Sequence, residues 1–227
     1  MPAEFSPHDD SLPSSTADSG LRVQTPRLTL RALRNSDTPF LHVLLGSDAL
    51  LGEPWDDAHA VRTRCDAPPY VRVVDEPSRF EIVYSPDRIE STVSRHHECE
   101  AENGFAFWLA ERRDKAEPVG LVGPLPREID GTRRIEIGWY IAPPVRRRGY
   151  ATEAAAGCID WVFDRFAEPA VYSAILANNV ASQVVARRLG MRVVDEDFEV
   201  ASLPHRLFAV SRAEWETRSR QMQPAVR

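Results

Sequence analysis

One stretch, residues 134–166, constrains the fold more than any other part of the chain. Its first part, 135–141, is rich in β-branched and aromatic residues and predicts a strand. Pro143 and Pro144 end that strand, because proline has no N–H to donate to a ladder. Beyond Gly149, small and apolar residues recur at helical spacing up to Phe166. The predicted order is therefore strand, turn and helix.

The turn between strand and helix carries three arginines, Arg146, Arg147 and Arg148, directly before Gly149. The first backbone N–H groups of a helix have no partner inside it, and the helix dipole adds partial positive charge there. A basic turn at a helix start is therefore a candidate phosphate site. The alternative is an ordinary solvated turn, because a lone glycine at a helix start is common.

Arg146-x-x-Gly149-x-Ala151 resembles the Q/R-x-x-G-x-G/A signature of the GNAT superfamily of N-acetyltransferases. Residues 25–31 resemble the T-x-R-L-x-L-R opening of its ribosomal-protein-alanine acetyltransferase (RimJ/RimL-type) branch. Residues 179–191 resemble its N-x-x-S-x-x-x-x-x-x-L-G-[FM] pattern, and 211–215 its closing T-R-E-E-W. These matches occur in the same order as in the family and extend over residues 22–216.

The resemblance implies an α/β (α+β) fold with a mixed, mostly antiparallel twisted sheet flanked by helices. The sheet is splayed between its fourth and fifth strands, and coenzyme A lies in the gap. The implied activity is transfer of the acetyl group of acetyl-CoA, the cosubstrate, to a primary amine, with no metal. The implied cofactor-binding residues are Ile141, Arg146, Arg147, Arg148, Gly149, Tyr150, Ala151, Thr152, Asn179 and Ser182.

The chemistry of amine acetylation points to two candidate catalytic residues. An amine attacks a thioester only when neutral, so a group must take the ammonium proton, and Glu136 on the predicted strand is the candidate. Strand alternation puts Glu136, Gly138 and Tyr140 on one face, and the sequence does not decide whether that face lines the gap. Glu153, in the first turn of the helix, is interpreted as complementing the helix dipole.

The helix that follows Asn179 departs from the family pattern. Many relatives carry a tyrosine seven residues after the asparagine as the acid for the departing thiolate, and here that position is Ala186. Ser182 is therefore the candidate to hydrogen-bond the sulfur. The alternative is that Asn179 only caps the helix and Ser182 only lies in its first turn.

The acceptor is not identified by the sequence. A protein N-terminus or a small-molecule amine fits the resemblance, and a polycationic amine of the aminoglycoside or polyamine type would need an acidic pocket. The loss of the tyrosine keeps open a catalytically silent acyl-CoA-binding regulatory module. Trp55 is interpreted as core rather than as an anchor over the acceptor. His205, at the start of an expected edge strand, is expected to be exposed, the alternative being a base that faces the acceptor.

Composition predicts one domain in a protein of 227 residues that is 43% hydrophobic. Residues 1–20 are expected to be a disordered tail, 21–217 a single acetyltransferase domain with an extended variable segment at about 51–103, and 218–227 a polar tail. A net charge of −6 argues against a nucleic-acid partner. No apolar run predicts a membrane span, and three cysteines without metal spacing fit a reducing, cytoplasmic location. A homodimer is compatible with these expectations.

Periodicity predicts the remaining elements. The expected strands are 27–31, 70–74, 79–84, 105–111, 119–126, 171–176, 193–201 and 205–211, and the expected helices are 38–45, 89–102 and the one after Asn179. His96 and His97 are adjacent on an expected helix and point to opposite sides, so no metal is assigned to them.

Overall fold

The computed structural model of the chain describes residues 21–45, 60–61, 70–75, 79–83, 86–200 and 203–222. The strands are β1 (Leu21–Gln24), β2 (Leu28–Arg31), β3 (Ala60–Val61), β4 (Tyr70–Asp75), β5 (Arg79–Val83), β6 (Trp108–Arg112), β7 (Pro118–Ile129), β8 (Thr132–Ile141), β9 (Ala170–Leu176), β10 (Arg192–Val200) and β11 (Leu203–Ser211). The helices are α1 (Thr38–Leu45), α3 (Pro86–Glu90), α4 (Thr92–Asn103), α5 (Tyr150–Arg165), α6 (Val180–Arg188) and α7 (Arg212–Met222), with 3₁₀ turns at Asn35–Asp37 and Pro143–Val145.

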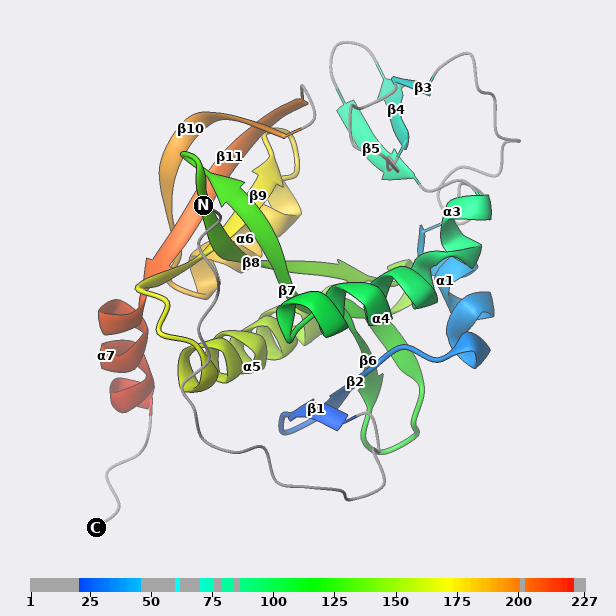
Figure 1. The fold of residues 1–227 in the computed structure, drawn as a ribbon, viewed down its shortest axis with the longest axis horizontal. Helices are drawn as coiled ribbons and strands as arrows, with labels where there is room; N and C mark the ends of the chain where they lie inside the picture. Colours follow the sequence, from blue (N-terminus) through cyan, green and yellow to red (C-terminus); the bar gives the residue numbers. More distant parts are fainter. Residues whose placement is uncertain are drawn as a thin grey trace.

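The main sheet has eight strands in the order β1-β2-β6-β7-β8-β9-β11-β10, and a small sheet has the order β3-β4-β5 (Figure 1). Helices lie on both faces of the main sheet. Residues of α5 and α6 join one hydrophobic core, and residues of α1, α3 and α4 join a second one against the opposite face. The expected mixed, mostly antiparallel fold is confirmed, and the expected strands 70–74 and 79–84 form the antiparallel pair β4–β5.

The β7–β8 hairpin is longer than the sequence pattern predicts. Its ladder is regular from Gly120↔Ile141 to Ile129↔Thr132. Asp130 and Gly131 form the turn with φ of 49° and 68°. Two consecutive left-handed residues give a turn whose twist matches that of the strands. Polar residues can therefore continue the ladder beyond the apolar run from which the strands were predicted.

Residues 105–107 do not pair as part of a strand, so the expected strand 105–111 begins only at Trp108. The chain crosses over β7 at Gly123, where a Cβ atom would lie 2.4 Å from the Ala106 carbonyl oxygen. The ring of Phe107 then lies against Gly138, which is the ladder partner of Gly123. The two facing glycines make room for this crossing.

The C-terminal motif closes the fold around the end of α5. Arg212 donates from Nη1 to the Phe163 carbonyl at 2.6 Å and from Nη2 to the Phe166 carbonyl at 2.5 Å. Trp215 donates from Nε1 to Asp160 Oδ1 at 2.7 Å. The two Arg212 bonds satisfy carbonyls that a helix C-terminus leaves open, and the Trp215 bond ties α7 to a side chain of α5. The helix α7 that carries Trp215 runs on to Met222, into residues that were expected to be tail.

Several expectations concern residues that are described in part or not at all. Residues 1–20, Trp55 and Cys65 lie outside the described residues. So do Glu53, Asp56, Asp57 and Glu76, acidic residues of the variable segment that would make a polycationic acceptor possible. Cys99 and Cys158 are free thiols, and burial raises the pKa of Cys158. Among the described helices, none is both long and apolar enough to cross a membrane.

A buried ion pair joins β2 to the start of α1 and yields a stability prediction. Arg31 donates to both carboxylate oxygens of Asp37, at 2.8 and 2.9 Å, and also pairs with Glu111 at 3.1 Å. Burial alone would raise the pKa of Asp37, but hydrogen bonds from Arg31 and from the Arg34 backbone lower it overall. A carboxyl whose folded-state pKa is depressed stabilises the fold above its unfolded-state pKa and loses that contribution as pH falls through the folded-state value.

Asp37→Asn should lower the free energy of unfolding by about 3 kcal/mol at pH 7, because Arg31 keeps only Glu111 as a charged partner. Denaturant unfolding at pH 7, 5 and 3 measures this effect, and the difference in free energy of unfolding between the variant and the wild type should become smaller toward pH 3. Asp114→Asn removes an exposed carboxylate paired with Arg112 and is the matched control, expected to change little. A gap that stays constant with pH would contradict the assignment.

Candidate active site

The two central strands β8 and β9 separate soon after they meet. They are parallel neighbours with one ladder pair, Glu136↔Tyr172. Beyond it, Ser173 Oγ donates to the Ile137 carbonyl at 2.6 Å, and the Ala174 N–H donates to Glu136 Oε1 at 3.1 Å. Side chains therefore replace the backbone ladder where the strands part. The expected splay between the fourth and fifth strands falls at this point.

Glu136 lies at the root of the split and is 6% exposed. Besides the Ala174 N–H, its carboxylate binds the guanidinium of Arg127, whose Nε and Nη2 each lie 2.6 Å from Oε2. A carboxylate has about four acceptor positions, and these contacts use three of them. Glu136 is thus a charged group held in place, with capacity for one further donor on Oε1.

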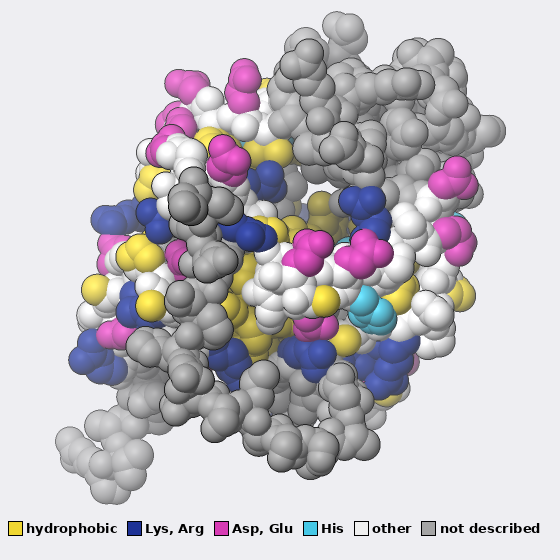
Figure 2. All heavy atoms as spheres, in the orientation of Figure 1, with side chains coloured by type: hydrophobic (Ala, Val, Ile, Leu, Met, Phe, Trp, Pro, Cys, Tyr) yellow, Lys and Arg dark blue, Asp and Glu magenta, His cyan; other side chains and the backbone are white. Residues whose placement is uncertain are grey.

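The face that carries Glu136 is opposite the face that packs on α5. Ile135 and Ile137 belong to the α5 core, whereas Tyr140 packs with α1 and α4. The Phe107 ring lies edge-on to Tyr140, with centroids 5.7 Å apart, and stacks near His96 at 6.0 Å. Figure 2 shows this side of the molecule hollowed beside α4, with hydrophobic side chains at the bottom and basic side chains at the edge. Glu136 therefore belongs to an aromatic-lined face of the sheet.

His205 lies on this same face, because Phe208 and Val210 of β11 pack in the α5 core and strand alternation turns His205 the other way. The expectation that it is exposed was wrong. It is 5% exposed, because β11 inserts between β9 and β10 and is not an edge strand. Its ladder partners are Leu176 on β9 and Phe198 on β10. Sequence reasoning missed its neighbours because the pattern of one strand does not give the strand order.

The turn before α5 has the backbone shape of an anion cradle. Arg147 and Gly149 adopt left-handed φ angles of 64° and 82°, and Gly149 is the N-cap of α5 without a side chain to bond the first turn. The first-turn N–H groups, from Tyr150, Ala151 and Thr152, are left for a ligand. Arg146 folds back, and its Nε donates to the Ile141 carbonyl at 2.9 Å. The arginine side chains 146–148 are exposed.

The opening T-x-R motif holds this turn from behind. Glu153 Oε1 accepts from Thr25 Oγ1 and from the Arg27 N–H, both at 2.7 Å, and Oε2 accepts from Arg27 Nε at 2.6 Å. Arg27 Nη1 donates to the Arg148 carbonyl at 3.0 Å, and its guanidinium lies 4.9 Å from the centroid of the Tyr150 ring. Burial alone would raise the pKa of Glu153, but these hydrogen bonds lower it overall. We call Thr25, Arg27 and Glu153 the turn brace.

The start of α6 faces the split from the other side. Asn179 is the N-cap, and its side chain accepts from the Ser182 N–H at 3.1 Å. Trp139 Nε1, on β8, donates to Ser182 Oγ at 3.3 Å and so spans the distance between β8 and α6. Ala186, at the position where relatives carry tyrosine, is fully buried in the α5 core. The capping role of Asn179 is thus present, while Ser182 lies beside the split.

The predicted site residues form two groups. Ile141 and residues 146–152 form one end of the split, and Asn179 and Ser182 lie across it, with Glu136 at its root. His96 and His97 turn to different backbone carbonyls, those of Thr92 and Leu33. Within the described part of the chain, no group of three or more His, Cys, Asp or Glu side chains could hold a metal ion.

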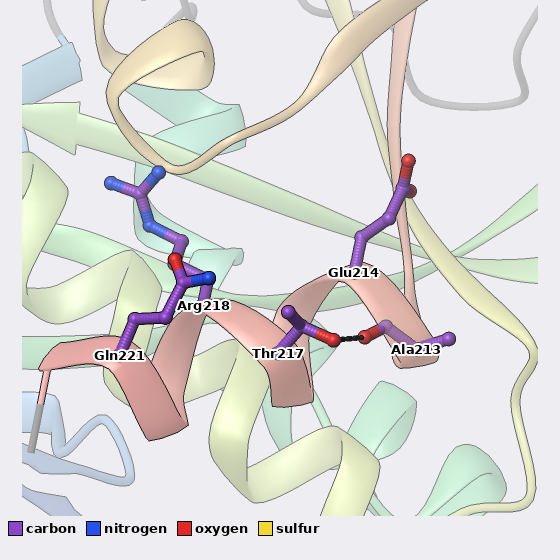
Figure 3. Close-up of a pocket in the computed structure, with 5 residues that line it drawn as sticks. All are labelled: Ala213, Glu214, Thr217, Arg218 and Gln221. Atoms are coloured by element: carbon purple, nitrogen blue, oxygen red, sulfur yellow. Dashed lines mark hydrogen bonds between the residues drawn. The ribbon is translucent and has the colours of Figure 1, made fainter.

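A shallow hollow on α7 is the other surface feature of note. Figure 3 shows that its lining residues come from one helix, and its hydrogen bond, from Thr217 Oγ1 to the Ala213 carbonyl at 2.8 Å, is internal to that helix. Arg218 reaches out of α7 to the Arg188 carbonyl at 2.5 Å. Groups from several elements do not converge there, so it is not a candidate site.

Comparison with known proteins identifies relatives of this architecture. The acetyltransferase (GNAT) domain family matches residues 27–192. A solved acetyltransferase from Agrobacterium tumefaciens strain C58 aligns with a TM-score of 0.60 and 20% identity, over 89% of this chain and 99% of that chain. The ribosomal-protein-S5-alanine acetyltransferase from Vibrio fischeri aligns with a TM-score of 0.56 and 14% identity, over 85% and 97%. These two likenesses are of fold.

Two further comparisons concern a ligand complex and sequence relatives. RimL, described as a ribosomal L7/L12 alpha-N-protein acetyltransferase in complex with coenzyme A, aligns with a TM-score of 0.57 and 18% identity over 84% of this chain and 97% of that chain. YjdG of Bacillus subtilis, described as an uncharacterized N-acetyltransferase, is 33% identical over 87 residues, or 38% of this chain and 51% of that protein. The uncharacterized YkkB of the same organism is 34% identical over 88 residues, 39% and 51%. The chain thus spans about half the length of these two relatives.

Glu153→Gln should loosen the turn brace. The variant loses the charge that accepts three hydrogen bonds, and the expected loss in free energy of unfolding is about 1–3 kcal/mol. Backbone amides of residues 146–152 should exchange hydrogen faster, as measured by hydrogen–deuterium exchange. Glu117→Gln, which removes an exposed carboxylate near Arg112, is the control. Equal protection of the turn in both variants would show that the brace does not hold it.

Proposed function

The chain belongs to the acetyltransferase (GNAT) family, and from that premise we propose that it transfers the acetyl group of acetyl-CoA to a primary amine. The observation that carries the proposal is the braced, left-handed turn at the start of α5, which opens beside a split in a parallel strand pair. A pyrophosphate needs several inward-pointing N–H groups, and an acyl chain needs a slot beside them.

The cofactor half of the proposal assigns pyrophosphate to the turn at residues 146–152. Its backbone N–H groups supply the hydrogen bonds to the pyrophosphate. The arginine side chains contribute electrostatic attraction for the anion rather than a shaped binding site. Beyond Glu136↔Tyr172, the edges of β8 and β9 can pair with the amide groups of the pantetheine arm, as a strand edge pairs with an extended peptide. Ile141 lies at the end of β8 next to the turn, and Asn179 and Ser182 lie at the thioester end.

The chemical half assigns Glu136 to the amine and Ser182 to the sulfur. Oε1 of Glu136 has room for one more donor, which suits an ammonium group or the water beside it. The Ser182 hydroxyl, held by Trp139, can donate to the departing thiolate. A thiolate leaves with little acid help at neutral pH, so Ala186 in place of tyrosine is compatible with turnover.

The acceptor that fits this face best carries one amine rather than many. Arg127 neutralises Glu136, and the surrounding described groups are aromatic rings and a buried histidine rather than a cluster of carboxylates. A peptide N-terminus meets these conditions, and it is the kind of acceptor for which RimL is described. We therefore propose an N-terminal peptide or a monoamine as acceptor.

Acetyl-CoA should raise the melting temperature through the turn. At about 100 times its dissociation constant it should add about 2.7 kcal/mol to the free energy of unfolding, and acetyl-pantetheine, which lacks the pyrophosphate, should add less. Gly149→Ala should reduce the acetyl-CoA shift, since the new Cβ lies in a strained left-handed turn 3.4 Å from Arg27 Nη2. Differential scanning fluorimetry measures all of these shifts.

Gly131→Ala is the matched control for Gly149→Ala. Both glycines have left-handed φ, so both variants carry the same kind of backbone strain, about 1–2 kcal/mol. A Cβ at Gly131 meets nothing within 4 Å and lies in the β7–β8 turn. Gly131→Ala should therefore keep the full acetyl-CoA shift. No shift for the wild-type protein at millimolar acetyl-CoA would refute cofactor binding.

Free thiol should be released from acetyl-CoA when an N-terminal peptide is added. A thiol-reactive dye reads the rate, with peptides and monoamines compared against spermidine and an aminoglycoside. We expect kcat/KM for the best peptide to exceed that for the polycations by about tenfold, since each unmatched charge is worth about 1 kcal/mol. Higher turnover of the polycations would reverse the acceptor assignment. If no amine causes thiol release although the protein still binds acetyl-CoA, a regulatory acyl-CoA-binding module is favoured.

A further inference from the structure

Three charged or titratable side chains from separate strands lie on the acceptor face of the sheet. They are Arg127 on β7, Glu136 on β8 and His205 on β11. Arg127 binds Glu136 directly, and the charges of both side chains act on the pKa of His205. The small Ala174 on β9, whose N–H binds Glu136, lies on the strand between them.

The hydrogen bond of His205 fixes which ring nitrogen can take a proton. His205 Nδ1 lies 2.9 Å from the Leu203 carbonyl oxygen. A carbonyl only accepts, so Nδ1 must carry the hydrogen in this contact. In the neutral ring, Nε2 is then the bare nitrogen, with a lone pair available to accept a proton. Glu136, by contrast, already accepts two hydrogen bonds and forms a further ion-pair contact with Arg127 Nη2.

We propose that His205 Nε2 accepts the proton of the acceptor ammonium, and that Glu136 and Arg127 are the positioning residues of this base. The inference rests on the proposed amine acetylation and deepens it. Glu136 alone was expected to bind the ammonium and take its proton, and the second role is now assigned to His205. Glu136 holds the ammonium or its water through Oε1, and Arg127 pairs with the carboxylate and fixes its position.

The proton balance of the step is complete. His205 takes one proton from R–NH₃⁺, and the amine lone pair forms the C–N bond at the thioester carbonyl. Collapse of the tetrahedral oxyanion breaks the C–S bond, and the electron pair leaves with sulfur. The second proton of the attacking nitrogen passes to the thiolate by way of Ser182. His205 then returns its proton to water, so the net products are amide, coenzyme A thiol and one proton.

The surroundings of His205 keep it in the accepting form. Burial lowers its pKa, opposed by the Leu203 carbonyl and by Glu136, and Arg127 lowers it further. Among the described residues, the charged groups that act on the pKa of the ring are Arg127 and Glu136. Its ladder neighbours on β9 and β10, Leu176 and Phe198, are uncharged. The ring is therefore neutral near pH 7, and it becomes charged and inactive as a base only at lower pH.

The test is the pH dependence of kcat/KM with an N-terminal peptide, in the full-length protein. His205→Gln should lower kcat/KM by about 10²- to 10⁴-fold. The low-pH limb set by His205 should vanish, and the remaining rate should rise with pH up to the pKa of the peptide amine, about 8. His42→Gln, on α1 and 40% exposed, is the matched control and should keep the wild-type profile.

Two further variants separate His205 from Glu136 as the base. Glu136→Gln removes a negative charge beside the ring, so the low-pH limb should remain and move to lower pH. Arg127→Gln removes a positive charge, so the limb should move to higher pH. If Glu136 is the base instead, Glu136→Gln abolishes the limb and His205→Gln keeps it, which overturns the inference.

The acetyl-CoA melting shift, measured on every variant, reports that the site is folded. If His205→Gln loses the acetyl-CoA melting shift, the other two variants still test the proposal, because Glu136→Gln and Arg127→Gln should move the low-pH limb of kcat/KM in opposite directions. A low-pH limb that moves in neither variant refutes the proposal. If the wild-type enzyme is active and His205→Gln keeps the low-pH limb of kcat/KM, only this inference is refuted. A wild-type protein inactive toward every amine refutes the proposed function itself.

Discussion

The separation of β8 from β9 is the constraint on which the rest of the site depends. Parallel strands that part leave N–H and C=O groups unpaired in the middle of a sheet, and such groups need partners. Glu136 and Ser173 supply them through side chains, at the Ala174 N–H and the Ile137 carbonyl. The split can therefore stay open without a ligand, and the price is a buried carboxylate. Arg127 offsets its charge.

The remaining contacts fix the two ends of this split. At one end the turn brace ties α5 to the β1–β2 connection, so the left-handed turn is shaped before a ligand arrives. At the other end the Trp139 indole reaches Ser182 on α6. Both ends are held by hydrogen bonds between elements rather than within one loop, which gives the site the rigidity of the sheet.

Sequence reasoning found the parts of the site that are local. The turn at 146–151 was predicted because proline, glycine and helical spacing act on their immediate neighbours. The placement of His205 on the same face as Arg127 and Glu136 was not predicted, because it depends on β11 lying between β9 and β10. The role of Glu153 was interpreted as structural, but Thr25 and Arg27 as its partners became visible only in three dimensions. Residues 105–107 read as strand because their aromatic side chains fit a strand equally well.

The turn brace also has a bearing on when the site comes into existence. Thr25 and Glu153 are separated by 128 positions in the chain. At roughly 5–20 residues per second, a ribosome needs roughly 6–26 s to make that interval. The T-x-R segment is thus made before α5, and it has no partner until α5 has been made. In a nascent chain the turn therefore lacks its brace until α5 has been made, so a segment made early completes its contacts late.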